Sequence, residues 1–441
     1  MDTNARRPRS LSRRELLAGA AAAAATGVLA SCSPSSGPRV EPAGPTSLPP
    51  RAPAPAPTVT TAAAPGPAAV PPPDRVLVIV NLYGGNDGLN TVVPLQGRYH
   101  DLRPAIGLAD DTLLRFPGTT AFGLHPKLGP LAELAAAGSV AALEAVGFPS
   151  PNRSHFAAQD DWASSTPGTA LRTGWVGRWL DALGPDGAHP LRAVALSGGA
   201  PMLDADGSRP TVVTNPAGFA FRAIGRPAGR DDVVTRWATG GGSGAEATVR
   251  NANASALAAV RTFAALQAGT GDDAERDTGG DDPAAGEFTA ALETAARVAT
   301  STAGVRVVHV AAGGFDTHAS QLATQADLLG DLATGIARFQ RHVESAGAAD
   351  RVLLMTVSEF GRRVHDNGYG TDHGKANVHF LVGRAVRAGL CGEADLVHLD
   401  DGDLRATTDV RAYYASVLTW LGADVERVLG RTWDDLGLLR P

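Results

Sequence analysis

The sequence predicts an α/β fold in which helices cover both faces of a mostly parallel central sheet. Short runs rich in valine, isoleucine and leucine read as strands buried on both faces, which is the pattern of a parallel sheet. Segments with helical periodicity alternate with these runs, and polar residues follow several of the runs directly. This alternation is typical of α/β proteins, whose ligands bind beside the carboxyl ends of the strands.

The first 32 residues predict an export signal. Ser12-Arg13-Arg14-Glu15-Leu16-Leu17 resembles the twin-arginine consensus, and an apolar run up to Ala30 follows it. This run is too short for an ordinary transmembrane helix, which needs about 20 residues. Leu29-Ala30-Ser31-Cys32 resembles a bacterial lipoprotein box, in which the cysteine becomes the lipidated first residue. The alternative is a plain signal peptide with a chance cysteine.

We therefore expect the twin-arginine translocase to export the chain. Lipidated Cys32 would anchor it to the outer face of the cytoplasmic membrane, or the protein would be secreted. The only other cysteine is Cys391, so a lipidated Cys32 leaves no partner for an intramolecular disulfide. Residues 33–73 are dominated by Pro, Ala, Ser and Thr and predict a stiff, extended linker that reaches up to ~130 Å.

Composition limits the partners of the folded part, residues 74–441. The chain has 39 Lys and Arg against 45 Asp and Glu, a formal net charge of -6, so no broad basic surface predicts nucleic acid binding. Aromatic residues make up only 5% of the chain, which argues against a stacking platform for bases.

The elements of this domain follow from its apolar patterns. The predicted strands cover residues 75–82, 139–146, 191–196, 305–310 and 351–357. The predicted helices cover residues 128–137, 175–183, 254–268, 287–301, 319–346, 375–387, 410–421 and 425–429. Residues 197–250 are assigned to loops and short helices. The acidic stretch 269–286 reads as a surface loop, because it lacks the spacing of an EF-hand.

Some polar residues in these elements have a structural interpretation. Asp327 and Asp331 stand one helical turn apart and indicate a solvated helix face. His309 lies within an apolar strand, and we expect it to be structural. Ser154 either caps a helix or is a hydroxyl nucleophile at a helix N-terminus, where free N–H groups favour an anion.

Candidate functional residues follow the ends of four predicted strands, and a polar loop adds a fifth group. The groups are Asp87, Ser154 with His155, Asp316 with His318, Glu359 with Arg362, and Asp372 with His373. Because parallel strands share one carboxyl edge, we expect these side chains to gather there. Carboxylates mixed with imidazoles suit one or two divalent cations, such as zinc, magnesium, manganese or calcium.

Five motifs in this order resemble a known family. NLYGGNDGLNTVVP, RSHFAAQDDW, GGFDTHASQ, SEFGRRV and GTDHGKAN are similar to the exported bacterial family named domain of unknown function 1501, within the alkaline phosphatase and sulfatase superfamily. The resemblance extends from Asp74 to the C-terminus. It implies an alkaline phosphatase-like domain over residues 74–441.

The resemblance also implies roles for individual residues. Asp87 would be a metal ligand, and Ser154 would correspond to the nucleophile. Asp316, His318 and His373 would form one metal site, and Glu359 with Asp87 the other. The superfamily pattern has an Asp-His pair after the late strand, where this chain has Glu359-Phe360. A second metal therefore requires His155, Asp372 or another side chain.

Two functions remain open from the sequence. In the first, the protein is a metal-dependent hydrolase of phosphate or sulfate esters in a small molecule or a polymer. The metal would lower the pKa of the Ser154 hydroxyl, while Arg362 or Lys375 would stabilise the equatorial oxygens. In the second, it is a catalytically inactive, metal-binding surface lipoprotein that acts as a binding or scaffold module.

Overall fold

The computed structural model describes residues 75–95, 97–169, 171–184, 189–196, 198–215, 219, 235, 238, 243–268 and 286–441. The predicted export signal and linker lie outside the described residues, as does nearly all of the acidic stretch 269–286. In the described ranges, no helix is both long and apolar enough to span a membrane. Cys391 is exposed and free.

A mostly parallel sheet forms the centre of the described part. Its strands are β1 (Val76–Leu82), β5 (Val140–Gly147), β6 (Ala193–Ala195), β7 (Thr211–Val212), β8 (Val307–Ala312), β9 (Val352–Val357), β10 (Asn377–Val382), β11 (Gly389–Cys391) and β12 (Thr408–Asp409). The order is β11-β5-β10-β9-β1-β8-β6-β7, and β12 also pairs with β5. β1 lies parallel to β8 and β9, whereas β10 is antiparallel to both of its neighbours, β5 and β9. The predicted sheet is thereby confirmed.

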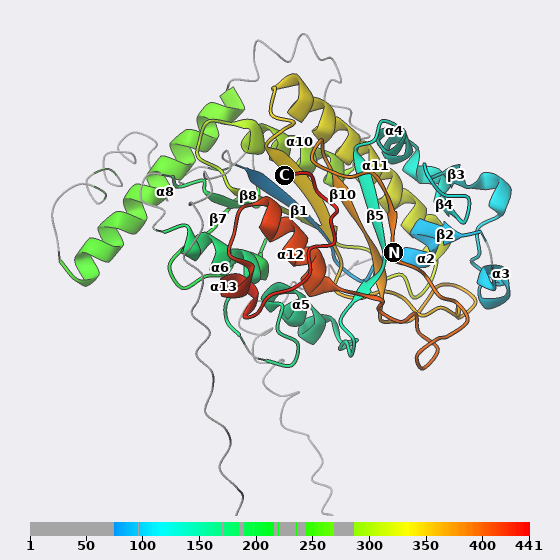
Figure 1. Ribbon diagram of the computed structural model, residues 1–441. Helices are drawn as coiled ribbons and strands as arrows, with labels where there is room; N and C mark the ends of the chain where they lie inside the picture. The colour runs from blue at the N-terminus through cyan, green and yellow to red at the C-terminus, as the bar shows by residue number, and fades with distance from the viewer. Residues whose placement is uncertain are drawn as a thin grey trace, which may run out of the picture. The chain divides into compact units, whose positions relative to one another are not determined.

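Helices cover both faces of this sheet because β1 alternates its side chains between two apolar cores. Val76, Val78 and Val80 belong to one core, and Leu77 and Ile79 to the other. The first core includes residues of α4 (Gly129–Ala136), α8 (Ala245–Ala268), α10 (Glu287–Thr300) and α11 (Gln321–Ser345). The second includes residues of α5 (His155–Ser164), α6 (Trp175–Ala182), α12 (Val410–Trp420) and α13 (Val425–Leu429). Figure 1 shows α12 in front of the sheet and α10 and α11 behind it.

Smaller elements follow β1 along the chain. They are α2 (Gly88–Thr91), β2 (Val92–Pro94), α3 (Tyr99–Leu102), η1 (Asp110–Thr112), β3 (Leu114–Arg115), β4 (Phe122–Leu124), η2 (Pro126–Leu128) and, later, η3 (Pro201–Leu203). The strands β2, β4 and β3 form a separate three-stranded sheet.

Two predictions of local structure were wrong. The segment 375–387 is not a helix: it contains β10, whose six residues are all buried. A short apolar run buried on both faces cannot be told from a buried helix by periodicity alone. Asp331 does not belong to a solvated face, because its carboxylate accepts hydrogen bonds from the backbone N–H groups of Phe288 (2.9 Å) and Thr289 (3.1 Å) at the start of α10.

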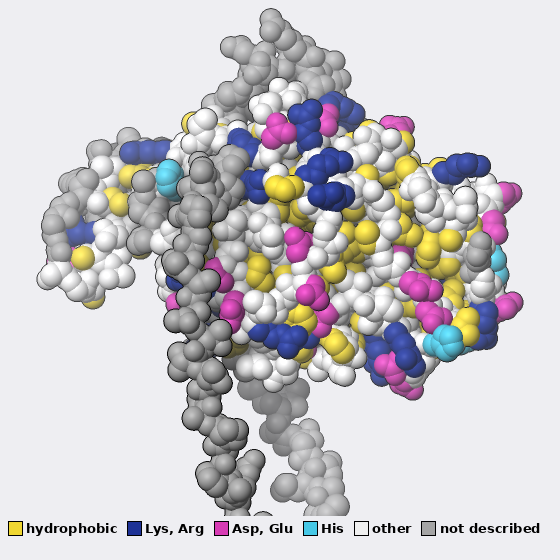
Figure 2. Space-filling model, in the orientation of Figure 1, with side chains coloured by type: hydrophobic (Ala, Val, Ile, Leu, Met, Phe, Trp, Pro, Cys, Tyr) yellow, Lys and Arg dark blue, Asp and Glu magenta, His cyan; other side chains and the backbone are white. Residues whose placement is uncertain are grey.

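The direction of β10 matters for the site. Because β10 runs against β9 and β5, its first residue lies at the edge where those two strands end. The loop that enters β10 therefore meets the loops that leave β1, β5, β8 and β9. On the face drawn in Figure 2, Lys and Arg side chains are scattered among Asp and Glu side chains.

Candidate metal centre

Three histidines surround the carboxylate of Asp316 at this edge of the sheet. His318 Nε2 lies 3.0 Å and His373 Nε2 3.1 Å from Asp316 Oδ1, and His155 Nε2 lies 3.3 Å from Asp316 Oδ2. The four side chains come from the loops after β8 and β5 and from the loop before β10. The structure thus brings together three of the predicted loops around one carboxylate.

Each imidazole is oriented through its other nitrogen. Nδ1 of His373 lies 2.8 Å from the carbonyl oxygen of Arg153. Nδ1 of His155 lies 3.0 Å from Oε1 of Glu359, and Nδ1 of His318 lies 3.0 Å from Oδ1 of Asp372. A carbonyl or carboxylate oxygen accepts hydrogen bonds, so each Nδ1 donates its proton. With Nδ1 engaged in this way, Nε2 is the nitrogen of each ring that can bind a cation beside Asp316.

This donor set fits a metal ion. Acceptors that face one another at 3.0–3.3 Å repel unless a proton or a cation lies between them. Ligands held ~2.0–2.2 Å from a tetrahedral zinc ion would stand ~3.3–3.6 Å apart. Imidazoles whose second nitrogen donates to a carboxylate or a carbonyl are the usual arrangement of metal-binding histidines. The donor atoms of His155, Asp316 and His373 all lie within 4.8 Å of one another, whereas His318 lies outside this group of three and contacts Asp316 and His373 from one side.

Asp316 stays charged at the centre of this group. Partial burial acts to raise the pKa of Asp316, but the contacts with Arg362 and His373 outweigh it and hold that pKa well below its usual range. Arg362 supplies the nearest charge, with its Nη2 2.7 Å from Asp316 Oδ1. A carboxylate that remains ionised is available as a metal ligand across the physiological pH range.

Glu359 forms the buried floor beneath His155. Its side chain is only 2% exposed, and its Oε1 accepts hydrogen bonds from the backbone N–H of Gly84 (2.8 Å) and from His155. Oε2 has no hydrogen-bond partner among the described residues. A side chain at Gly84 would place its Cβ 2.4 Å from the backbone nitrogen of Asp316, so only glycine allows the β1 loop to approach both acids.

Three predicted site residues lie apart from the three-histidine cluster (His155, His318 and His373 around Asp316) or are engaged by other partners. Asp87 is buried and forms an ion pair with Arg103, and it also accepts a hydrogen bond from Gln321. Arg362 is enclosed, because besides Asp316 it donates to the carbonyl oxygens of Gly84, Gly85, Phe315 and Thr371. Lys375 forms an ion pair with Asp400 at 2.8 Å. Neither carboxylate predicted for a second metal, Asp87 or Glu359, contacts the other in the described part.

In the chain, Ser154 lies between Arg153, which contacts the cluster, and His155, which belongs to it. It occupies the N-cap position of α5, as predicted, but its side chain makes no capping hydrogen bond. Ser154 is exposed, whereas Arg153 before it holds His373 through its carbonyl, and His155 after it faces Asp316. His309, expected to be structural, is fully buried within β8, where burial lowers its pKa to about 4.

The sequence interpretation missed three contributors to the cluster. Phe360 packs beneath the imidazoles, with ring centroids 5.0 Å from His155 and 4.4 Å from His373. Gln159 lies one helical turn after His155 and reaches the same Glu359 oxygen at 3.4 Å. The i, i+4 spacing on a helix could have indicated Gln159. The carbonyl of Arg153 has no sequence signal, because every residue carries one.

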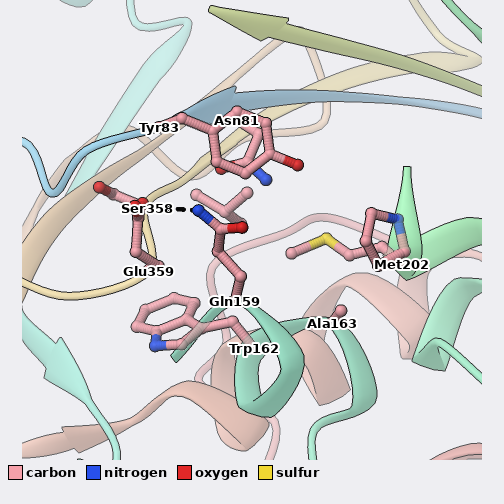
Figure 3. A pocket seen from close by; sticks show the side chains of 10 residues that line it. Asn81, Tyr83, Gln159, Trp162, Ala163, Met202, Ser358 and Glu359 are labelled. Carbon is pink, nitrogen blue, oxygen red and sulfur yellow. Dashed lines mark hydrogen bonds between the residues drawn. The ribbon is translucent and has the colours of Figure 1, made fainter. Parts of the chain in front are cut away.

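A narrow pocket opens beside Glu359. Figure 3 shows the amide of Gln159 between Tyr83 and Trp162, with Met202 across from it. The pocket has a volume of about 10 Å³, which is room for about one water molecule. Burial, together with the charge of Glu359, raises the pKa of Tyr83 to about 12, so its phenol stays neutral.

Comparisons with known proteins give one family and several distant structures. The family model "Protein of unknown function (DUF1501)" matches residues 137–436, and no curated protein matches the chain. The lipoteichoic acid synthase LtaP from Listeria monocytogenes is 9% identical, with a TM-score of 0.37, and the match covers 81% of this chain and 75% of that one.

Two further solved structures give similar values. An alkaline phosphatase superfamily protein from Vibrio parahaemolyticus is 8% identical, with a TM-score of 0.39 and coverage of 82% of this chain and 69% of that one. The phosphonate monoester hydrolase SpPMH from Silicibacter pomeroyi is 10% identical, with a TM-score of 0.36 and coverage of 82% and 78%. Similarities at this level assign no activity.

Proposed function

The chain belongs to the DUF1501 family, and we propose that it is a metal-dependent hydrolase of phosphate or sulfate esters. The observation that carries this proposal is the convergence of three imidazole Nε2 atoms on the carboxylate of Asp316, each imidazole oriented by a hydrogen-bond acceptor at its Nδ1. Such an arrangement suits one divalent ion, held by His155, Asp316, His318 and His373.

The residues around the ion would divide the work. A bound divalent ion supplies Lewis acidity, which polarises an ester and favours deprotonation of a nearby hydroxyl. Ser154 is exposed at the N-terminus of α5 and would attack the phosphorus or sulfur of the ester, releasing the alcohol and leaving an esterified serine. Water would then cleave this serine ester, releasing the phosphate or sulfate group and restoring the hydroxyl. The N–H groups of the first turn of α5 would favour the negative charge of the substrate there. Glu359, Asp372 and the carbonyl of Arg153 would keep the imidazoles in place.

We also propose that the protein is exported by the twin-arginine pathway and anchored through Cys32. Arg13-Arg14 and the Leu29–Cys32 sequence support this proposal. Replacing both arginines with lysine should block export, and Cys32→Ala should allow export but release the protein from membranes. Membrane retention of the Cys32→Ala protein would refute the lipid anchor.

A second candidate function is a metal-binding module without turnover. It is favoured because both side chains predicted to stabilise the substrate are already engaged. Arg362 is enclosed and paired with Asp316, and Lys375 is paired with Asp400. In this function, the site would keep the metal while Ser154 remains unmodified.

Metal analysis combined with an ester panel separates the two candidates. The hydrolase should hold about one divalent ion per chain and cleave phosphate or sulfate esters. Ser154→Ala should abolish cleavage but leave metal content intact, and its stability loss should stay below the ~1 kcal/mol typical of a lost cap, because no capping bond exists. Ser345→Ala, an exposed serine at the far end of α11, is the matched control. Wild-type protein that holds metal but cleaves no ester favours the binding module.

A further inference from the structure

We infer that the site accepts ester groups that carry one negative charge, phosphodiesters or sulfate monoesters, in preference to phosphate monoester dianions. This inference rests on the proposed function and concerns the charge of its substrate. It follows from the ion pairs that the positive side chains around the three-histidine cluster form. The cations of the ligand-bearing loops are each committed to a carboxylate of the protein itself.

The four Lys and Arg residues of these loops can be followed one by one. Over residues 83–91, 147–155, 313–320 and 358–376 they are Arg153, Arg362, Arg363 and Lys375. The Arg362 side chain has no exposed surface and donates its hydrogen bonds to Asp316 and to backbone carbonyl oxygens. It orients a metal ligand and cannot also reach a substrate oxygen.

The other three cations are held by one acidic turn, residues 400–403. Asp400 pairs with Lys375 at 2.8 Å, and Asp403 pairs with Arg153 at 3.0 Å and with Arg363 at 3.5 Å. Asp401 adds weaker pairs with both arginines, at 3.9 and 4.0 Å. This turn therefore neutralises the cations that flank Ser154 and His373.

In the ligand-bearing loops, all of which the structure describes, the remaining charges are negative. Asp316 is balanced by Arg362, whereas Glu359 and Asp372 face imidazoles rather than Lys or Arg. One divalent ion would offset these two carboxylates and leave little surplus positive charge. A group with a single negative charge can be accommodated there, but the second charge of a monoester dianion meets no free partner.

A rate comparison with one leaving group tests this directly. Metal-loaded full-length protein is assayed with bis(4-nitrophenyl) phosphate, 4-nitrophenyl sulfate and 4-nitrophenyl phosphate. We expect kcat/KM for at least one of the first two to exceed that for the monoester by roughly tenfold or more. The ratio should grow as pH rises through about 6, where the monoester takes its second charge. A monoester preference at pH 8 would overturn the inference.

A binding measurement works without turnover. Dimethyl phosphate should raise the melting temperature of the metal-loaded protein more than methyl phosphate does at pH 8. The opposite order would overturn the inference. If no ester is cleaved, the proposed function fails, and the melting shifts still decide the charge preference.

A charge-release variant gives the sharpest test. Asp400→Asn frees Lys375 beside the site and should improve kcat/KM for the monoester relative to the diester by several fold. Asp350→Asn is the matched control: it frees Arg384 from a more exposed ion pair (3.5 Å), at the amino end of β9 and so at the opposite edge of the sheet. It should leave the ratio unchanged. An unchanged ratio in Asp400→Asn, or an equal change in both variants, would contradict the role of the acidic turn.

Discussion

Replacing Glu359 with glutamine should weaken metal binding although Glu359 is not a member of the four-ligand set. The carboxylate accepts the Nδ1 proton of His155 at 3.0 Å and the N–H of Gly84 at 2.8 Å through the same oxygen. Glutamine keeps the shape but removes the charge. The loss of such an outer partner typically lowers metal affinity 10- to 100-fold, about 1.4–2.8 kcal/mol.

The variant should also be less stable without metal. Oε2 of Glu359 is buried and has no partner in the described part of the chain, so an amide nitrogen in that place would bury two unpaired donors. An unsatisfied buried donor costs about 1–3 kcal/mol. If the amide flips instead, its nitrogen faces the Nδ1 proton of His155 and the N–H of Gly84, which is no better. Either orientation lowers the free energy of unfolding of the metal-free protein.

Titration calorimetry with zinc or manganese measures the first effect, and thermal unfolding in chelator measures the second. Glu344→Gln makes the same chemical change on the exposed surface of α11 and should alter neither quantity. If Glu359→Gln binds metal as tightly as the wild type, the carboxylate does not orient His155, and the assignment of its tautomer is wrong.

Three further outcomes are expected. Burial raises the pKa of Glu144 from 4.5 to about 8, so the folded protein keeps a proton that the unfolded chain releases. The free energy of unfolding should fall between those pH values by on the order of 4 kcal/mol relative to Glu144→Gln, measured by urea titration. A chelator should lower the melting temperature of the wild-type protein. It should leave the melting temperature of His318→Ala unchanged, because that variant holds no metal to remove. His309→Leu should preserve or raise stability at unchanged metal affinity, because neither ring nitrogen has a hydrogen-bond partner within the described ranges.

The strands and the edge of the sheet could be predicted from the sequence because unbroken apolar runs need burial on both faces. The run in β1 and the one in β9 are of this kind, and all of their residues are buried. The strand β10 was not predicted, because Asn377 and His379 interrupt its apolar run and are nevertheless buried. Polar residues in the middle of a sheet carry no periodic signal.

The site was only partly predictable for a different reason. The residue types at the strand ends indicated metal chemistry, and the structure gathers His155, Asp316, His318 and His373 there. Asp87 has the same residue type and position, but it pairs with Arg103. Nothing in a sequence states which distant arginine reaches a given carboxylate, because that depends on how the loops pack.

The pairing of β5 sets the order in which the protein can be assembled during synthesis. Its sheet neighbours β10, β11 and β12 all lie after it in the chain and near the C-terminus. The parallel group β1, β8 and β9 can form before β10 leaves the ribosome, whereas β5 and the His155 loop behind it must wait for β10 to connect them to that group. Contacts so distant in sequence form late. The complete set of ligands therefore forms only after β10 has been made, and a chain that ends before β10 would not hold His155 beside Asp316.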